Sequence, residues 1–260
     1  MTPAERIESA LRAKNDQQRG AGLPALVGYL TAGFPTRESF RDNLNSMAQE
    51  ADVIEIGVPF TDPMADGVTI QRASEQALRN GVTLEWILEE LAQMEPVRTP
   101  LLLMSYTNPL LNYGLERLAA RAAACHVCGF IVPDLPFDES GDFRAAMAPH
   151  GLALVQMVTP VTPPDRLATV AGASQGFLYA VTMTGTTGQQ RSGPGPSADY
   201  LERVRAVSKV PVCAGFGIRS SEQIEALRGQ VDGVIIGTAL VEVIERGESP
   251  RRWLASLRGR

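Results

Sequence analysis

The sequence is poor in several features that would each indicate a class of protein. No apolar stretch among its 260 residues approaches the roughly 20 residues that a membrane-spanning helix needs. The formal net charge is −5, which disfavours binding to nucleic acid by bulk electrostatic attraction. Residues 1–12 are charged and amphipathic and hold no apolar signal core, so we expect no export signal, no membrane association and a cytoplasmic location.

Cysteine is also scarce, with three residues in the whole chain, too few for a disulfide framework. Two of them form the C-x-x-C spacing Cys125-His126-Val127-Cys128, which could indicate a redox pair or half of a zinc site. No second pair supplies the remaining zinc ligands. The preferred interpretation is therefore that both thiols pack as small apolar side chains where a helix meets a strand.

What the chain does have is a regular alternation of apolar strands and amphipathic helices. The predicted strands cover residues 23–31, 53–57, 101–104, 129–132, 152–158, 177–181, 210–214 and 234–236. The predicted helices cover residues 2–13, 36–51, 69–79, 83–94, 115–124, 143–147, 164–171, 198–208, 222–227 and 238–244. Near-continuous apolar strands are typical of parallel sheets that are buried on both faces.

This order predicts an α/β fold in which residues 1–260 form a single (β/α)8 TIM-barrel domain. Extra helices are expected at the N-terminus and after the second strand. A doubly wound open sheet is the alternative. The chain shows no domain linker, no low-complexity tract and no glycine fingerprint for a dinucleotide after its first strand.

One acidic segment, residues 55–67, stands out within this pattern. Glu55 lies inside an apolar strand, where a carboxylate is costly to bury unless it is paired or used. The loop that follows contains two prolines and two further acids, Asp62 and Asp66. Because the active site of such a barrel lies at the carboxyl ends of its strands, Glu55 is predicted to be functional, whereas Asp62 fits a solvated turn equally well.

The scarcity of lysine and histidine excludes several mechanisms at that end of the barrel. Lys14 lies in the leading helix and Lys209 just before a strand, so no lysine is placed to form an imine with a substrate or with pyridoxal phosphate. His126 and His150 also precede strands, which leaves no histidine for a metal aldolase or a serine–histidine triad. The remaining carboxylates, tyrosines and hydroxyls suit general acid–base chemistry without a metal or an organic cofactor.

Glycines follow the last predicted strands. Gly215-Phe216-Gly217 comes after the seventh, Gly237-Thr238 after the eighth, and Gly185-Thr186-Thr187-Gly188 after the sixth. Phosphate commonly binds to backbone N–H groups and helix N-termini at these positions of a barrel. Each glycine pair, taken alone, could simply form a tight turn. Because the glycines together follow the last three strands, they favour a phosphorylated substrate.

Residues 55–67 resemble the signature of the tryptophan synthase alpha subunit family, and the likeness extends over nearly the whole chain. Val68 stands where the family often has proline, and Thr186 replaces a common valine, but neither change removes a functional group. The other segments that carry the resemblance are Thr31-Ala32-Gly33, Tyr106-Thr107-Asn108-Pro109, Pro133-Asp134-Leu135-Pro136, Gly185 to Gly188, Ala214-Gly215-Phe216-Gly217-Ile218 and Gly237-Thr238.

The resemblance implies a lyase of tryptophan biosynthesis that cleaves indole-3-glycerol phosphate to indole and glyceraldehyde 3-phosphate by a retro-aldol reaction. By this resemblance Glu55 would shuttle protons and Asp66 would accept the indole N–H, with Thr187 positioning Asp66. Tyr29 and Tyr106 would line the indole pocket, and Tyr179 would bound the site near Glu55. The phosphate would meet the amides of Gly188, Gly217, Gly237 and Thr238, with Phe216 and Ile218 around it.

The resemblance also implies a protein partner. The family works as an alpha-beta-beta-alpha complex with a pyridoxal-phosphate beta subunit, which receives the indole. Pro59, Phe60, Asp62 and Pro63 resemble the loop that contacts this partner; Phe60 could be an exposed anchor or could fold back on the barrel rim. A stand-alone lyase and a catalytically weak allosteric subunit remain as alternatives, although the presence of the predicted catalytic groups argues against the second.

Overall fold

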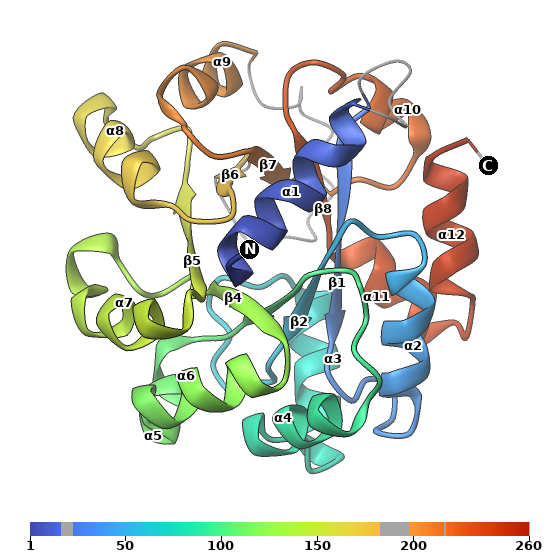
Figure 1. Cartoon of the computed structure of the whole chain (residues 1–260). Coiled ribbons are helices and arrows are strands. Elements are labelled where there is room, and N and C mark those ends of the chain that lie inside the picture. The colour runs from blue at the N-terminus through green and yellow to red at the C-terminus, as the bar shows by residue number, and fades with distance from the viewer. Residues whose placement is uncertain (17–22, 183–197, 216, 260) are drawn as a thin grey trace.

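The structure is a computed structural model that describes residues 1–16, 23–182, 198–215 and 217–259. Its strands are β1 (Ala25–Thr31), β2 (Val53–Gly57), β3 (Leu101–Met104), β4 (Val127–Ile131), β5 (Ala153–Val158), β6 (Leu178–Val181), β7 (Val212–Gly215) and β8 (Gly233–Ile236). All neighbours pair in parallel and in sequence order, and β8 pairs with β1 to close the barrel (Figure 1). This arrangement confirms the predicted (β/α)8 barrel and rules out the doubly wound open sheet.

Helices surround the barrel (Figure 1). They are α1 (Pro3–Asp16), α2 (Ser39–Ala48), α3 (Val68–Arg79), α4 (Leu84–Gln93), α5 (Thr107–Tyr113), α6 (Leu115–Ala124), α7 (Gly141–Met147), α8 (Pro164–Ala173), α9 (Ala198–Val207), α10 (Ser221–Glu225), α11 (Thr238–Glu245) and α12 (Pro250–Leu257), with the 3-10 turns η1 (Phe137–Glu139) and η2 (Ala148–His150). The predicted extra helices are confirmed, because α1 precedes β1 and both α3 and α4 lie between β2 and β3.

Two helices, α5 and α12, go beyond the predicted pattern. α5 has seven residues and carries Pro109 in its first turn, where the missing N–H has no helical partner to lose. In the sequence alone Pro109 indicates a loop, and for this reason the helix is not predicted. α12 begins with Pro250 after Ser249, whose side chain accepts the N–H of Arg252. This Ser-Pro start is a helix signal, but it lies beyond the last predicted helix.

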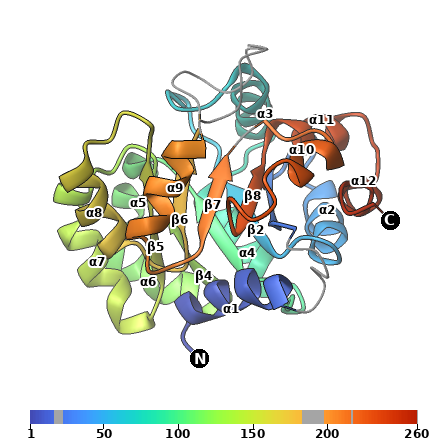
Figure 2. The same cartoon turned by 90° about the horizontal axis from the view of Figure 1, so that it is seen from above.

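The barrel interior is closed at the amino ends of the strands by α1. Figure 2 shows α1 beneath the strands, at the end opposite α3. Ile7 and Leu11 of α1 are fully buried and pack against inward-facing residues such as Val27, Val53 and Leu102. One end of the barrel is therefore filled with apolar side chains, which leaves the carboxyl ends of the strands as the open end.

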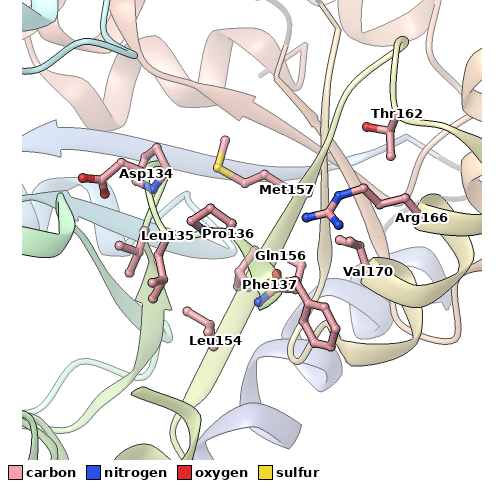
Figure 3. Close-up of a pocket in the computed structure, with 13 residues that line it drawn as sticks. Asp134, Leu135, Pro136, Phe137, Leu154, Gln156, Met157, Thr162, Arg166 and Val170 are labelled. Carbon is pink, nitrogen blue, oxygen red and sulfur yellow. The ribbon is translucent and has the colours of Figure 1, made fainter. Parts of the chain in front are cut away.

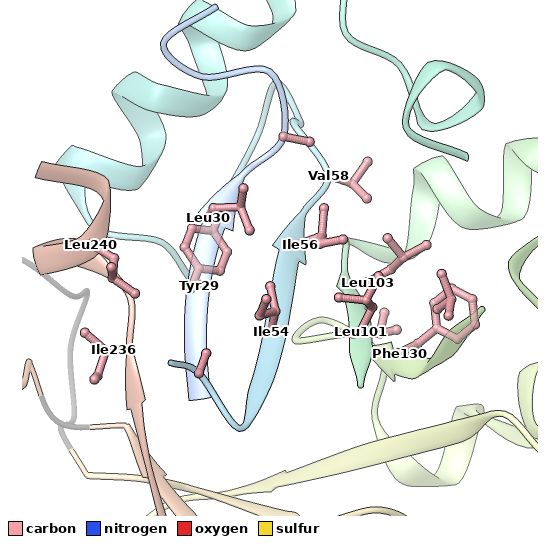
Figure 4. Packing of buried hydrophobic residues seen from close by; sticks show 14 of the residues in the cluster. Tyr29, Leu30, Ile54, Ile56, Val58, Leu101, Leu103, Phe130, Ile236 and Leu240 are labelled. Atoms are coloured by element: carbon pink, nitrogen blue, oxygen red, sulfur yellow. The ribbon is translucent and has the colours of Figure 1, made fainter. Parts of the chain in front are cut away.

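A second core lies between the strands and the outer helices. Leu30, Ile54, Ile56 and Leu103 belong to this outer cluster (Figure 4). Side chains alternate between the two faces of a strand, and Val53 belongs to the inner cluster while Ile54 and Ile56 belong to the outer one. This alternation turns the side chain of Glu55 into the barrel.

The scarce residues lie where the sequence predicts. His126 precedes β4, His150 ends η2 before β5, and Lys209 precedes β7, so all three are at the amino ends of strands. Cys125 and Cys128 are buried at the end of α6 and in β4, which confirms their interpretation as apolar packing residues. None of the helices in the described ranges is long and apolar enough to cross a membrane.

Candidate active site

Glu55 is an isolated acid inside the barrel. It pairs in register with Tyr29 of β1 and Leu102 of β3, and only 1% of its surface is exposed. Its Oε1 atom is buried and has no hydrogen-bond partner among the described residues. Burial raises the pKa of Glu55 from 4.5 to about 8, because no cation or donor of the described residues compensates the charged form. The side chain is therefore mostly protonated at neutral pH and can both give and take a proton.

Two tyrosines enclose Glu55, and glycines make room for both of them. A Cβ on Gly57 would collide with the ring and hydroxyl of Tyr29, and a Cβ on Gly215 would lie 2.6 Å from the hydroxyl of Tyr179. The pKa values of both tyrosines are raised, first by burial and further by the nearby charges of Glu55 and Asp66. The Tyr29 hydroxyl hydrogen-bonds to that of Thr31 at 3.2 Å. This geometry places Tyr29 and Tyr179 close to Glu55; the roles of Tyr179 as the boundary of the site and of Tyr29 as a wall of the indole pocket remain predictions.

Asp66 lies at the mouth of the barrel, beside a small hollow. Its carboxylate accepts a hydrogen bond from the Tyr106 hydroxyl at 3.1 Å, and Asp66 is 8% exposed. Burial raises the pKa of Asp66 from 3.8 to about 6, against the opposing effect of the Tyr106 hydrogen bond. The residues that line the hollow are Tyr29, Val58, Phe60, Pro63, Asp66, Ser74, Met104, Ser105 and Tyr106.

Two residues of α3 hold the acidic loop in place and carry no signal in the sequence. The Ser74 hydroxyl accepts the N–H of Phe60 at 2.8 Å and donates to its carbonyl at 3.1 Å. The Gln71 amide donates to the carbonyl of Asp66 at 2.8 Å. In the sequence both residues look like ordinary polar residues of a helix. They gain these hydrogen-bond partners only because α3 folds back over the loop.

The loops after β7 and β8 form the candidate phosphate end. Gly217 has a φ of +64°, and a Cβ on it would meet no atom of the described residues within 4 Å. Gly237 is the N-cap of α11, and Thr238 is the first residue of that helix. A Cβ on Gly237 would lie 3.5 Å from Ile70 and 3.9 Å from Tyr29, which places this helix N-terminus next to the tyrosine that lines the hollow. Ile218, the residue after Gly217, is buried.

Three predicted site residues, Thr187, Gly188 and Phe216, lie outside the residues that the structure describes, as does the whole segment 183–197. Their predicted roles in positioning Asp66 and in holding phosphate remain predictions. The described part of the site therefore contains both acids, the three tyrosines and one side of the phosphate end.

The loop predicted to contact a partner has a mixed character. Pro59 is buried, Pro63 is half-buried and Asp62 is exposed. The Phe60 ring is half-buried and stacks on Tyr106 with 5.2 Å between the ring centroids. Of the two alternatives for Phe60, the ring thus adopts the one that folds back on the barrel rim, because Tyr106 offers it an aromatic face.

A second hollow lies outside the barrel, between the loop after β4 and helix α8 (Figure 3). Arg166 reaches over it and pairs with Asp138 at 2.7 Å. It shares no lining residue with the hollow at Asp66, and none of the predicted site residues that the structure describes lines it. Within the described ranges, no group of three or more His, Cys, Asp or Glu side chains is arranged to hold a metal ion.

Comparison with known proteins agrees with this geometry. The family model described as tryptophan synthase alpha chain matches residues 14–258. The tryptophan synthase alpha chain of Solidesulfovibrio magneticus is 44% identical, over 97% of this chain and 99% of that protein. That of Chloroflexus aggregans is 43% identical, over 88% of this chain and 86% of its own length.

Solved structures give the same answer. Mycobacterium tuberculosis tryptophan synthase superposes with a TM-score of 0.87 at 34% identity, covering 99% of this chain and 97% of that one. The tryptophan synthase subunit alpha of Legionella pneumophila gives 0.84 at 30% identity, covering 98% and 97%. With matches of this extent in sequence and in fold, the chain belongs to the tryptophan synthase alpha chain family.

Proposed function

We propose that Glu55 and Asp66 are the catalytic residues with which this chain cleaves indole-3-glycerol phosphate. As a member of its family, the chain is a carbon–carbon lyase of tryptophan biosynthesis that releases indole and glyceraldehyde 3-phosphate. The observation that carries the assignment of residues is the pair of buried acids at the open end of the barrel, both with raised pKa values.

The reaction needs one group that first gives and then takes a proton. Protonated Glu55 donates to C3 of the indole ring, which converts the ring to an iminium-like form. The resulting carboxylate then takes the proton of the glycerol hydroxyl on the carbon attached to C3, and the bond between these carbons breaks. Indole and an aldehyde leave, and Glu55 is protonated again, so that no external acid, base or oxidant is consumed.

Asp66 stabilises the positive charge that develops during this reaction. When C3 is protonated, the ring nitrogen becomes positively charged, and a carboxylate beside its N–H stabilises that state. The hydrogen bond from Tyr106 orients Asp66 toward the hollow. Tyr29 and Tyr106 line the hollow that would take the indole ring, and Tyr179 bounds the site near Glu55.

The phosphate of the substrate would lie at the N-terminus of α11. Gly217, Gly237 and Thr238 would supply backbone N–H groups there, and buried Ile218 is assigned to the surroundings of the phosphate by the family resemblance. Gly188 and Phe216 are assigned to the same group, and Thr187 to Asp66, by the family resemblance. The short path from Gly237 to Tyr29 supports a single substrate that reaches from the phosphate end to the hollow.

Family membership implies a beta-subunit partner, and the alternatives of a stand-alone lyase and a weak allosteric subunit are not favoured. We assign Pro59, Phe60, Asp62 and Pro63 to the contact with that partner, in an alpha-beta-beta-alpha complex. Exposed Asp62 lies in the same loop as Asp66, four residues before it, which supports a link between partner contact and active site.

The test is the release of indole from indole-3-glycerol phosphate by the purified chain, alone and with a tryptophan synthase beta subunit. Slow release that rises many-fold with the partner is the expected result. Fast release that is indifferent to the partner would instead support the stand-alone lyase. No release under either condition would overturn the assignment of substrate.

A further inference from the structure

We infer that Asp134, acting through Thr107, is a positioning residue for the active site: it fixes the backbone from which the Tyr106 hydroxyl reaches Asp66. The inference rests on the role proposed above for Asp66. It concerns a residue of the loop after β4, whereas Asp66 is in the loop after β2.

The first link is between the loop after β4 and the start of α5. The Oδ1 atom of Asp134 accepts the backbone N–H of Thr107 at 2.8 Å and the Thr107 hydroxyl at 2.9 Å. Tyr106, the N-cap of α5, makes no side-chain cap of its own. Asp134 thus supplies from another loop the acceptor that a capping side chain usually provides, and a carboxylate at a helix N-terminus is favourable.

The second link runs from α5 to the acidic loop. The Tyr106 hydroxyl donates to Asp66 Oδ2 at 3.1 Å and accepts the N–H of Ala65 at 2.9 Å. A tyrosine side chain has two torsions and a rigid ring, so its hydroxyl follows the position of its backbone. Thr107 directly follows Tyr106 in the chain. The hydrogen bonds from Thr107 to Asp134 therefore also restrict where the Tyr106 hydroxyl can lie.

Asp134 has no place in the substrate hollow itself. It is exposed, and Figure 3 shows its carboxylate turned away from Arg166 and Gln156. It lines the hollow outside the barrel, but it does not line the hollow at Asp66. A role in the reaction must then pass through Thr107 and Tyr106, which makes the inference testable by coupling between substitutions.

The test compares turnover of the full-length chain for Asp134→Ala, Asp134→Asn and Thr107→Val. Asp134→Ala is expected to lower kcat about ten-fold, the effect of weakening one hydrogen bond to a charged group. Asp134→Asn should restore nearly normal turnover, because its amide oxygen can accept both bonds. Thr107→Val removes only the hydroxyl bond and should have a smaller effect. Asp138→Ala is the matched control, since it is an exposed acid of the same loop that pairs with Arg166 instead.

Two further readouts separate positioning from a general loss of structure. In a Tyr106→Phe background, Asp134→Ala should cause no further loss, because the hydroxyl that it positions is absent. The acid limb of the rate profile should move to higher pH in Asp134→Ala, since the Tyr106 hydrogen bond lowers the pKa of Asp66. Among the described residues, the other titratable groups around Asp66 are Tyr29, Tyr179 and Glu55, and these are unchanged in the variants.

The inference is overturned if Asp134→Ala turns over normally, if its effect adds fully to that of Tyr106→Phe, or if Asp134→Asn is as impaired as Asp134→Ala. A loss seen only with the beta subunit present would make Asp134 a partner contact instead. Asp66→Asn distinguishes failure of the proposed function from failure of the positioning role. Normal turnover of Asp66→Asn would refute the proposed catalytic role of Asp66. Low turnover of Asp66→Asn together with normal turnover of Asp134→Ala would refute only the positioning role of Asp134.

Discussion

Replacing Glu55 by glutamine should change how the stability of the protein depends on pH. The folded state holds a proton on Glu55 up to about pH 8, whereas the unfolded chain loses it near 4.5. Between these two values the folded state binds one more proton than the unfolded state, so the stability of the wild-type protein falls as pH rises. Glu55→Gln has no titrating group at this position, so its stability does not decrease for this reason.

The magnitude follows from the two pKa values. Each pH unit between 4.5 and about 8 contributes roughly 1.4 kcal/mol. The difference in free energy of unfolding between Glu55→Gln and wild type should therefore change in favour of the variant by up to about 5 kcal/mol between pH 4 and pH 9. Most of the change should occur from pH 5 to 8, and the difference should level off above that.

Urea unfolding of both proteins at a series of pH values measures this difference directly. Asp66 also titrates in this range, but it is present in both proteins and cancels in the comparison. Glu89→Gln on the exposed side of α4 is the matched control, and its difference from wild type should stay nearly constant with pH. A Glu55→Gln difference that is equally flat would refute the claim that Glu55 is buried without a compensating partner.

Four further predictions concern the reaction and the partner. The profile of kcat/KM against pH should be bell-shaped, rising through about pH 6 as Asp66 ionises and falling through about pH 8 as Glu55 loses its proton; a flat profile over this range would contradict both assignments. Asp66→Asn should lower kcat about 100-fold and abolish the acid limb in the same assay, so a limb that persists would have another origin. Gly237→Asp should raise KM ten-fold or more by placing a negative charge at the phosphate end, whereas Gly237→Ala, whose Cβ meets no atom of the described residues closer than 3.5 Å, should raise it little; equal effects would place the phosphate elsewhere. Asp62→Ala should weaken binding of the beta subunit about five-fold in a titration, and unchanged affinity would remove Asp62 from the contact.

The fold and the position of Glu55 could be predicted from the sequence because each rests on a local pattern. Apolar strands that alternate with helices specify a parallel barrel, and an acid within the strand 53–57 has a face assigned by simple alternation. Because the active site of such a barrel lies at the carboxyl ends of its strands, the topology alone then predicts where the candidate site lies.

What the sequence could not predict depends on contacts between distant segments. Ser74 and Gln71 are unremarkable helix residues until α3 folds back over the acidic loop. The ring of Phe60 has two plausible positions, and only the placement of Tyr106 selects between them. The bonds from Asp134 to Thr107 join residues 27 positions apart, which no spacing rule connects.

The central claim is that Glu55 transfers the protons of the lyase reaction. Indole release by Glu55→Gln, measured with the beta subunit present and at saturating indole-3-glycerol phosphate, tests it most directly. We expect a folded variant that still binds glyceraldehyde 3-phosphate but whose turnover is lost, because an amide cannot donate and recover the proton. Near-normal turnover of this variant would contradict the claim.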